Sequence, residues 1–342
     1  MDGEGFMVQS DVALLCTRGL RVAEAREFDR ARALLQRAME NAGEDKRLQG
    51  RVRISLCRLD TLRGDFDEAR RHGVRALDLL QAHGHPDGIA EAAIYLGSVE
   101  GNQSRFPAAE AMYSKALRML ANSDDQRLLA LAHWGMASAA NDQQRFQEAY
   151  DHARIAAECG KELLTLGERG RLQHLIGVIC RDRDMFEDAL ACELTALRML
   201  EIAGELEVVA DTHNTVGSIH ARRGDRCAAR TSYEQALAAL NGEVTPQTAD
   251  AYHEMARIDL EEGQASAALD HARMALEAAV KVRSDLDEGR AALALGQALV
   301  SLGRREDALP HVRRALEIFT TCRMSQSQLV ARDILRYAEG GT

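Results

Sequence analysis

The sequence contains little proline and few aromatic residues. Its 342 residues include 4 prolines, and Phe, Trp and Tyr together make up 4%. So few prolines leave long helices uninterrupted, and strands usually contain more aromatic and β-branched residues than this sequence offers. Ala, Leu, Arg and Glu, which favour helices, recur throughout. We therefore predict an all-α protein.

The cysteines and the N-terminus also lack familiar patterns. None of the 7 cysteines stands in a CxxC pair, and an odd number cannot all pair within one chain. The first residues, MDGEGFMVQSD, carry acids where a signal peptide has a basic end and an apolar run. No stretch has the length and apolarity of a membrane span. We expect a reducing, cytoplasmic location and no membrane partner.

Charge and motifs argue against nucleic-acid binding and catalysis. The formal net charge is −10, and no basic stripe stands out, so we expect no nucleic-acid partner. The sequence has no P-loop, GxGxxG, GxSxG or HExxH motif. The 11 histidines recur at matching repeat positions and do not gather at one point, so we interpret them as packing or half-buried surface residues. We predict no enzyme activity, no metal and no cofactor.

A short pattern recurs along almost the whole chain: a small turn, two residues, Ala, six residues, then Ala-Leu. Examples are GDFDEARRHGVRAL at 64–77 and GDRCAARTSYEQAL at 224–237. The first Ala of each copy falls at residues 31, 69, 109, 149, 189, 229, 268 and 308, so the period is 38 to 40 residues. A fixed period of this length is the signature of a helical repeat protein.

Each repeat reads as two helices joined by a tight turn. A small residue stands twelve positions before each of these alanines and allows the two helices to approach closely: Gly19, Cys57, Gly97, Ala137, Gly177, Gly217, Ala256 and Gly296. Gly-Asp in the turn supplies a left-handed residue that ends the first helix and a cap for the second. After the last repeat, SQSQLVARDILRYA at 325–338 reads as an amphipathic capping helix with its apolar side on the last repeat and its polar side in water.

These residues resemble the tetratricopeptide repeat over roughly residues 11–320. The period of about 40 exceeds the usual 34, and the Pro that usually closes the second helix is absent. In both respects the chain is similar to the longer-period subclass found in bacterial signalling regulators and Leu-Gly-Asn-type scaffolds. The resemblance implies one domain over residues 1–342, a right-handed α-solenoid of eight helical hairpins plus the capping helix. We expect repeats at about 11–48, 49–86, 87–126, 127–166, 167–206, 207–246, 247–285 and 286–324.

In that family the first helices line the concave groove, and ligands contact residues three before and one and four after the small residue. Carried over to this sequence, these positions are apolar at both ends of the array and polar in the middle, and Tyr95 adjoins one of them. Trp134, the only Trp, is a candidate anchor, although it would equally fill a gap between helices. The candidate groove residues are Arg58, Tyr95, Trp134, Asn141, His174, Arg181, Asn214, Ser218, His253 and Arg257.

The resemblance implies a scaffold that holds a partner protein, or an extended peptide, in this groove. A groove lined with hydrogen-bonding side chains suits a peptide backbone, whose amides need partners once water is removed. The positions hold no Lys, and no Asn follows the small residue, so binding of chaperone C-terminal tails is disfavoured. An alternative is a ligand- or peptide-sensing regulatory module of a bacterial signalling or transcription system with its output domain elsewhere. Self-association is less favoured, because Arg18 solvates the N-terminal edge.

Overall fold

The structure, a computed structural model, describes residues 2–83 and 86–340, with side chains from residue 8 onward. Over these residues it consists of helices joined by short turns, and it contains no strand. By its contacts the chain divides into two compact units, Met1–Arg183 and Asp184–Thr342, each of which is described by itself. The all-α prediction is confirmed.

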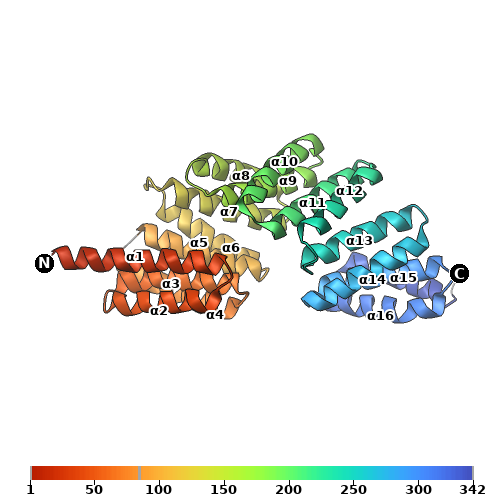
Figure 1. Cartoon of the computed structure of the whole chain (residues 1–342), viewed down its shortest axis with the longest axis horizontal. Helices are drawn as coiled ribbons and strands as arrows, with labels where there is room; N and C mark the ends of the chain where they lie inside the picture. The colour runs from red at the N-terminus through yellow and green to blue at the C-terminus, as the bar shows by residue number, and fades with distance from the viewer. Residues whose placement is uncertain (1, 84–85, 341–342) are drawn as a thin grey trace. The chain divides into compact units, whose positions relative to one another are not determined.

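The first unit contains the helices drawn from red to green in Figure 1. Their bounds are α1 Asp2–Glu24, α2 Phe28–Ala42, α3 Lys46–Leu62, α4 Phe66–Ala82, α5 Pro86–Asn102, α6 Phe106–Met119, α7 Gln126–Asp142, α8 Phe146–Gly160 and α9 Leu166–Asp182.

The second unit contains the helices drawn from green to blue in Figure 1. Their bounds are α10 Phe186–Ala203, α11 Leu206–Arg222, α12 Arg226–Ala239, α13 Pro246–Glu261, α14 Ala265–Val282, α15 Asp285–Ser301, α16 Arg305–Thr321 and α17 Ser325–Ala338.

Within each unit the helices stack as hairpins. In the first unit α1, α3, α5 and α7 each pack against the even-numbered helix that follows, and in the second α11, α13 and α15 do the same. Each odd-numbered helix also contacts the next odd-numbered helix of its unit, whereas no two even-numbered helices touch within the described residues of either unit. The odd-numbered helices therefore form a continuous layer in each unit.

Small residues set the close approach of the two helices in a hairpin. A Cβ added at Gly97 would lie 2.8 Å from the ring of Tyr113 on α6, and one at Gly217 would lie 2.5 Å from Tyr233 on α12. The repeated alanines are fully buried, as Ala69 and Ala229 illustrate with 0% exposure. Large side chains thus fill the space that the small residues leave, as the sequence pattern predicts.

The turns inside the hairpins have the predicted chemistry. Gly64 and Gly224 adopt φ of 76° and 82°, in the left-handed region that glycine enters without strain. The next residues, Asp65 and Asp225, cap α4 and α12 by accepting hydrogen bonds from backbone N–H groups. Where no glycine is present another residue takes the left-handed conformation, as Ser104 does with φ of 56°.

Buried charges connect successive hairpins. Asp60 on α3 is fully buried and forms an ion pair with Arg32 on α2, and its other oxygen lies 3.7 Å from His72 on α4. Glu100 on α5 pairs in the same way with Arg70 on α4, at 2.9 Å. A buried carboxylate with a partner on the preceding hairpin fixes how the two hairpins are aligned, because an unpaired buried charge is costly.

The expected repeat bounds stay predictions, and α1 begins at Asp2, before the expected start near residue 11. The capping helix is present as α17, but its outer side is not purely polar, since Leu329 and Tyr337 are 58% and 49% exposed.

The single domain, the right-handed twist and the count of eight hairpins stay predictions, because α9 and α10 of the expected fifth hairpin belong to different units. None of the described helices has the length and apolarity to cross a membrane.

Candidate binding surfaces on the odd-numbered helices

Each unit has a face formed by the sides of its odd-numbered helices that point away from the hairpin interiors, which we call the odd-helix face. On α3, for example, Val52, Leu56 and Leu59 are buried in a cluster with residues of α1 and α2. At 100° per residue, Arg51 and Arg58 lie together on another side of the helix, about 120° around its axis from the middle of these three residues. Buried residues surround most of α3, and Arg51 and Arg58 stand on the strip of the helix that they leave at least partly uncovered for binding.

Two of the predicted groove residues meet on this face of the first unit. The guanidinium carbon of Arg58 lies 4.8 Å from the centroid of the Tyr95 ring on α5, a cation–π contact. Burial raises the pKa of Tyr95, and the charge of Arg58 opposes this effect. Burial also raises the pKa of the neighbouring Glu91, and the positive charges of Arg51 and Arg58 oppose this rise.

The starts of α7 and α9 are joined by a bidentate ion pair. Arg127 donates to both carboxylate oxygens of Glu168, at 3.0 and 2.7 Å. Burial alone would raise the pKa of Glu168, but the hydrogen bonds from Arg127 and from the backbone of Thr165 lower it to about 2. This pair orients α9 beside α7. Further along α7, Trp134 is half-buried.

The remaining predicted residues of the first unit are Asn141 near the end of α7, His174 in the middle of α9 and Arg181 near the end of α9. Asn141 is half-buried, and its Oδ1 is a buried acceptor without a hydrogen bond from the described residues. His174 is half-buried as well. Arg181 donates to both carboxylate oxygens of Asp182, at 2.8 and 3.1 Å. Its positive charge is therefore matched within the chain.

In the second unit, Asn214 is the most buried of the predicted residues, with 4% exposure. Its Nδ2 donates to the backbone oxygen of Gln247 at the start of α13, at 3.0 Å. Its Oδ1 is buried and accepts no hydrogen bond from the described residues. Ser218, one turn further along α11, is half-buried. Asn214 therefore both links α11 to α13 and retains an unused acceptor.

His253 and Arg257 lie in a network of charges on α13 and α15. Arg257 donates to Glu254 at 2.9 Å and also pairs with Glu261. Burial lowers the pKa of His253 to about 4, and Arg290 adds to this effect. The Nδ1 of His253 is buried without a hydrogen-bond partner among the described residues. The histidine is therefore neutral at physiological pH.

The centre of this network is Arg290 on α15, which sequence reasoning missed. It lies 3.1 Å from Asp250 and 3.3 Å from Glu254, both on α13, and 3.6 Å from Asp287 on its own helix. Burial raises the pKa of Asp250 to about 6, although Arg290 opposes the shift. Three carboxylates thus share one guanidinium on the odd-helix face.

A signal for these missed residues is present in the sequence. The position six residues before the small residue lies about one turn ahead of the positions we considered and on the same side of the helix. It carries a charge in most repeats: Arg51, Glu91, Arg171, Asp211, Asp250 and Arg290. The structure brings together Arg58 with Tyr95, and His253 with Arg257. The other predicted residues are distributed along the faces of their own units.

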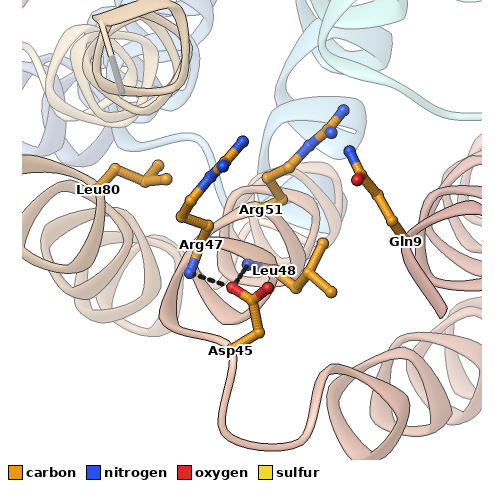
Figure 2. Close-up of a pocket in the computed structure, with 6 residues that line it drawn as sticks. All are labelled: Gln9, Asp45, Arg47, Leu48, Arg51 and Leu80. Atoms are coloured by element: carbon orange, nitrogen blue, oxygen red, sulfur yellow. Dashed lines mark hydrogen bonds between the residues drawn. The ribbon is translucent and has the colours of Figure 1, made fainter. Parts of the chain in front are cut away.

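A small pocket lies at the start of α3 (Figure 2), lined by Gln9, Asp45, Arg47, Leu48, Arg51 and Leu80. The Asp45 carboxylate accepts hydrogen bonds from the backbone N–H groups of Arg47 and Leu48, at 2.8 and 3.1 Å. It therefore caps the helix. Among the described residues, no group of three or more His, Cys, Asp or Glu side chains is placed to hold a metal ion.

Comparison with solved structures places this architecture among known folds. A Rap protein complexed with the competence and sporulation factor is 18% identical and has a TM-score of 0.68, with 97% of this chain and 98% of that chain covered. The apo form of the quorum sensor NprR from B. thuringiensis is 14% identical with a TM-score of 0.66, covering 85% and 82%. Aspartyl phosphate phosphatase F from Bacillus subtilis is 14% identical with a TM-score of 0.56, covering 97% and 94%.

Residues 247–321, which span α13 to α16, match the tetratricopeptide repeat family. No curated protein matches the chain. The solved structures are too distant in sequence to carry more than the fold, but that fold extends over almost the whole chain. The resemblance inferred from the repeat is confirmed: the chain contains tetratricopeptide repeats at residues 247–321, and its helical hairpins have the fold of tetratricopeptide-repeat proteins.

Proposed function

We propose that this protein is a scaffold that holds a segment of another polypeptide on its odd-helix faces. The observation that carries the proposal is the pair of amides Asn141 and Asn214, one in each unit. Each has an Oδ1 that is buried and accepts no hydrogen bond from the described residues. A buried acceptor without a donor is costly. The backbone N–H groups of an extended peptide are suitable donors once the amide rotates to expose its oxygen.

The other residues of these faces suit the same task. The half-buried Tyr95 and Trp134 offer large side chains that combine an apolar body with a polar tip. Arg58 is held against the Tyr95 ring, so that its guanidinium loses little freedom when it binds. Anchors of this kind contribute most of the binding energy in protein interfaces.

The similar structures favour a second candidate function, a regulatory module that responds to a bound signal. One of them is complexed with a competence and sporulation factor, and another is a quorum sensor. In this version the bound segment is the signal, and the output lies in another protein or domain. Both candidates use the same faces and differ in what binding changes.

We propose binding and not catalysis as the task of this chain, although one similar structure is named a phosphatase. The sequence lacks the catalytic motifs considered above, and tetratricopeptide-repeat folds are generally binding scaffolds. We also place the protein in the cytoplasm, away from membranes and nucleic acids. None of the described cysteines forms a disulfide, which fits a reducing compartment.

Selection of peptides tests the scaffold proposal. Random dodecapeptides displayed on phage are selected against the full chain, and their binding is followed by fluorescence polarisation and by the emission of Trp134, the only Trp. The face is then blocked with Ser138→Arg on α7 or Ser218→Arg on α11, both half-buried positions. We expect the selected peptides to bind at least tenfold more weakly to one or both variants.

The matched controls add the same side chain on even-numbered helices. Ala111→Arg on α6 and Thr231→Arg on α12 replace exposed residues. Peptides that lose affinity for these variants, but not for the Ser138 and Ser218 variants, would place the binding surface elsewhere and refute the proposal. Thermal melting separates the two candidates: a small molecule that raises the melting temperature where selected peptides do not would favour the sensor.

A further inference from the structure

One helix of the first unit carries a row of arginines whose guanidinium groups form no ion pair with the described residues. Arg47, Arg51 and Arg58 lie on α3 at spacings of four and seven residues, which places all three on one side of the helix. Arg47 and Arg51 are exposed, and Arg58 is half-buried. The row belongs to the odd-helix face of the first unit.

Other arginines on the odd-helix faces have carboxylate partners, for example Arg127 with Glu168 and Arg290 with Asp250. Within the part of the chain that the structure describes, the three arginines of α3 form no ion pair. The acid at the start of the helix, Asp45, caps the helix, because its carboxylate accepts hydrogen bonds from the backbone N–H groups of Arg47 and Leu48. Glu91 on α5 interacts electrostatically with Arg51 and Arg58 but forms no ion pair with either among the described residues. Three guanidinium groups beside this one carboxyl make the row a local excess of positive charge in a protein of net charge −10.

The surroundings leave the guanidinium groups accessible. In Figure 2 the side chains of Arg47 and Arg51 extend to the same side of α3, away from the Asp45 carboxylate. Gln9 stands beside them, and Leu48 and Leu80 line the rest of the pocket. Arg58 is held by the Tyr95 ring two turns further along. Like charges one turn apart on a helix repel each other, and a bound anion relieves this repulsion.

We propose that this row binds the side-chain carboxylates of an acidic, extended segment of the partner protein. Four residues of helix separate Arg47 from Arg51 by about 6 Å, and alternate side chains of an extended peptide are about 7 Å apart. A Glu-x-Glu sequence therefore matches the first two arginines, and Arg58 lies about 10 Å further on. Each guanidinium can hold a carboxylate through two parallel hydrogen bonds. This inference rests on the proposed function and adds the chemistry of the partner.

The probe is a fluorescein-labelled peptide of alternating Glu and Ser, and its counterpart has Gln in place of Glu. Binding to the full chain is measured by fluorescence polarisation at low salt and at about 150 mM salt. We expect the Glu peptide to bind, the Gln peptide to bind at least tenfold more weakly, and the affinity for the Glu peptide to fall with salt because the charges are exposed.

The variant R47E/R51E reverses the first two charges and should weaken binding of the Glu peptide at least tenfold. The matched control is R71E/R75E, which makes the same change of charge at the same spacing on exposed positions of α4. It should alter the affinity less than threefold. The milder R47Q/R51Q replaces the first variant if circular dichroism shows that R47E/R51E is not helical.

Equal losses in R47E/R51E and R71E/R75E would show a general charge effect and overturn the proposal, as would equal binding of the Glu and Gln peptides. Tighter binding of a single-stranded oligothymidylate than of the Glu peptide would overturn it in favour of nucleic acid. If the peptides selected by display bind to the odd-helix faces but the Glu peptide does not, the acidic partner is wrong and the scaffold function stands.

Discussion

His271 on α14 places its Nδ1 2.6 Å from the Oδ2 of Asp259 on α13. Asp259 is fully buried, and its Oδ1 accepts a hydrogen bond from Arg230 on α12 at 2.7 Å. One carboxylate thus joins three helices of two successive hairpins. Asp60 has the same arrangement in the first unit, with Arg32 and His72. Equivalent positions of distant repeats have therefore kept the same buried ion pair.

Replacing this carboxylate tests its role. Asp259→Asn keeps the size of the side chain but removes the buried partner of Arg230, which then retains only the more exposed Glu262. We expect the free energy of unfolding to fall by about 2 kcal/mol, because the buried charged partner is lost and Glu262 replaces it only in part. Urea unfolding followed by circular dichroism measures the change. Asp270→Asn, at an exposed position on α14, should stay within about 0.5 kcal/mol of the unchanged protein.

Two glycines with opposite surroundings test the close packing of the hairpins. A Cβ at Gly217 would lie 2.5 Å from the buried Tyr233 ring, whereas one at Gly101 would find its nearest atom at 4.0 Å. Gly217→Ala should lower the free energy of unfolding by about 1 to 3 kcal/mol through overpacking. Gly101→Ala should raise it by about 0.5 to 1 kcal/mol, because alanine favours the helix. Thermal and urea unfolding of both variants check this, and equal effects would contradict the packing.

His253 makes stability depend on pH. Its pKa of about 4 in the folded protein lies below the ordinary value of 6.5, so the unfolded chain binds the proton more tightly. The free energy of unfolding should therefore fall as the pH is lowered from about 6.5 to about 4, by up to about 3 kcal/mol from this group. His253→Gln should lose less stability over this range than the unchanged protein, as measured by urea unfolding at several pH values.

Asp250, three residues away on the same helix, should act in the opposite direction. Its pKa of about 6 in the folded protein lies above the ordinary value of 3.8, so the folded protein binds the proton more tightly. This group therefore favours folding as the pH falls through 6 and partly offsets the effect of His253. Asp250→Asn removes the offset and should steepen the loss of stability on acidification. A shallower loss would contradict the placement of Asp250.

The pair of Arg127 and Glu168 should stabilise the first unit above acid pH. Glu168 has a pKa of about 2, below its ordinary value of 4.5, so its contribution is complete above pH 4.5 and is lost as the pH falls through 2. Glu168→Gln should lower the free energy of unfolding by about 2 kcal/mol at neutral pH and by less near pH 3. Glu158→Gln, an exposed position on α8, is the control and should change little at either pH. An equal deficit of Glu168→Gln at both pH values would refute this account.

Much of the fold was predictable because the same pattern of small and large residues recurs eight times in the sequence. The period predicted pairs of helices joined by short turns, and the Gly-Asp turns at Gly64 and Gly224 follow from the left-handed conformation that glycine tolerates. These features are local, since each depends on residues a few positions apart. The candidate surface was only partly predictable. Arg58 and Tyr95 were expected on it, but their contact joins two hairpins.

The sequence by itself determined the helices, the hairpins and the side of each helix that is buried, because hydrophobic spacing, small residues and turn residues act over short distances. Only the tertiary structure decided which charges remain available. Arg290 and Arg51 occupy the same repeat position, yet Arg290 is paired with Asp250 and Glu254 on the neighbouring odd-numbered helix, whereas Arg51 forms no ion pair among the described residues. Whether a charge is neutralised depends on distances of a few ångströms between side chains, and those distances are set by how the helices pack.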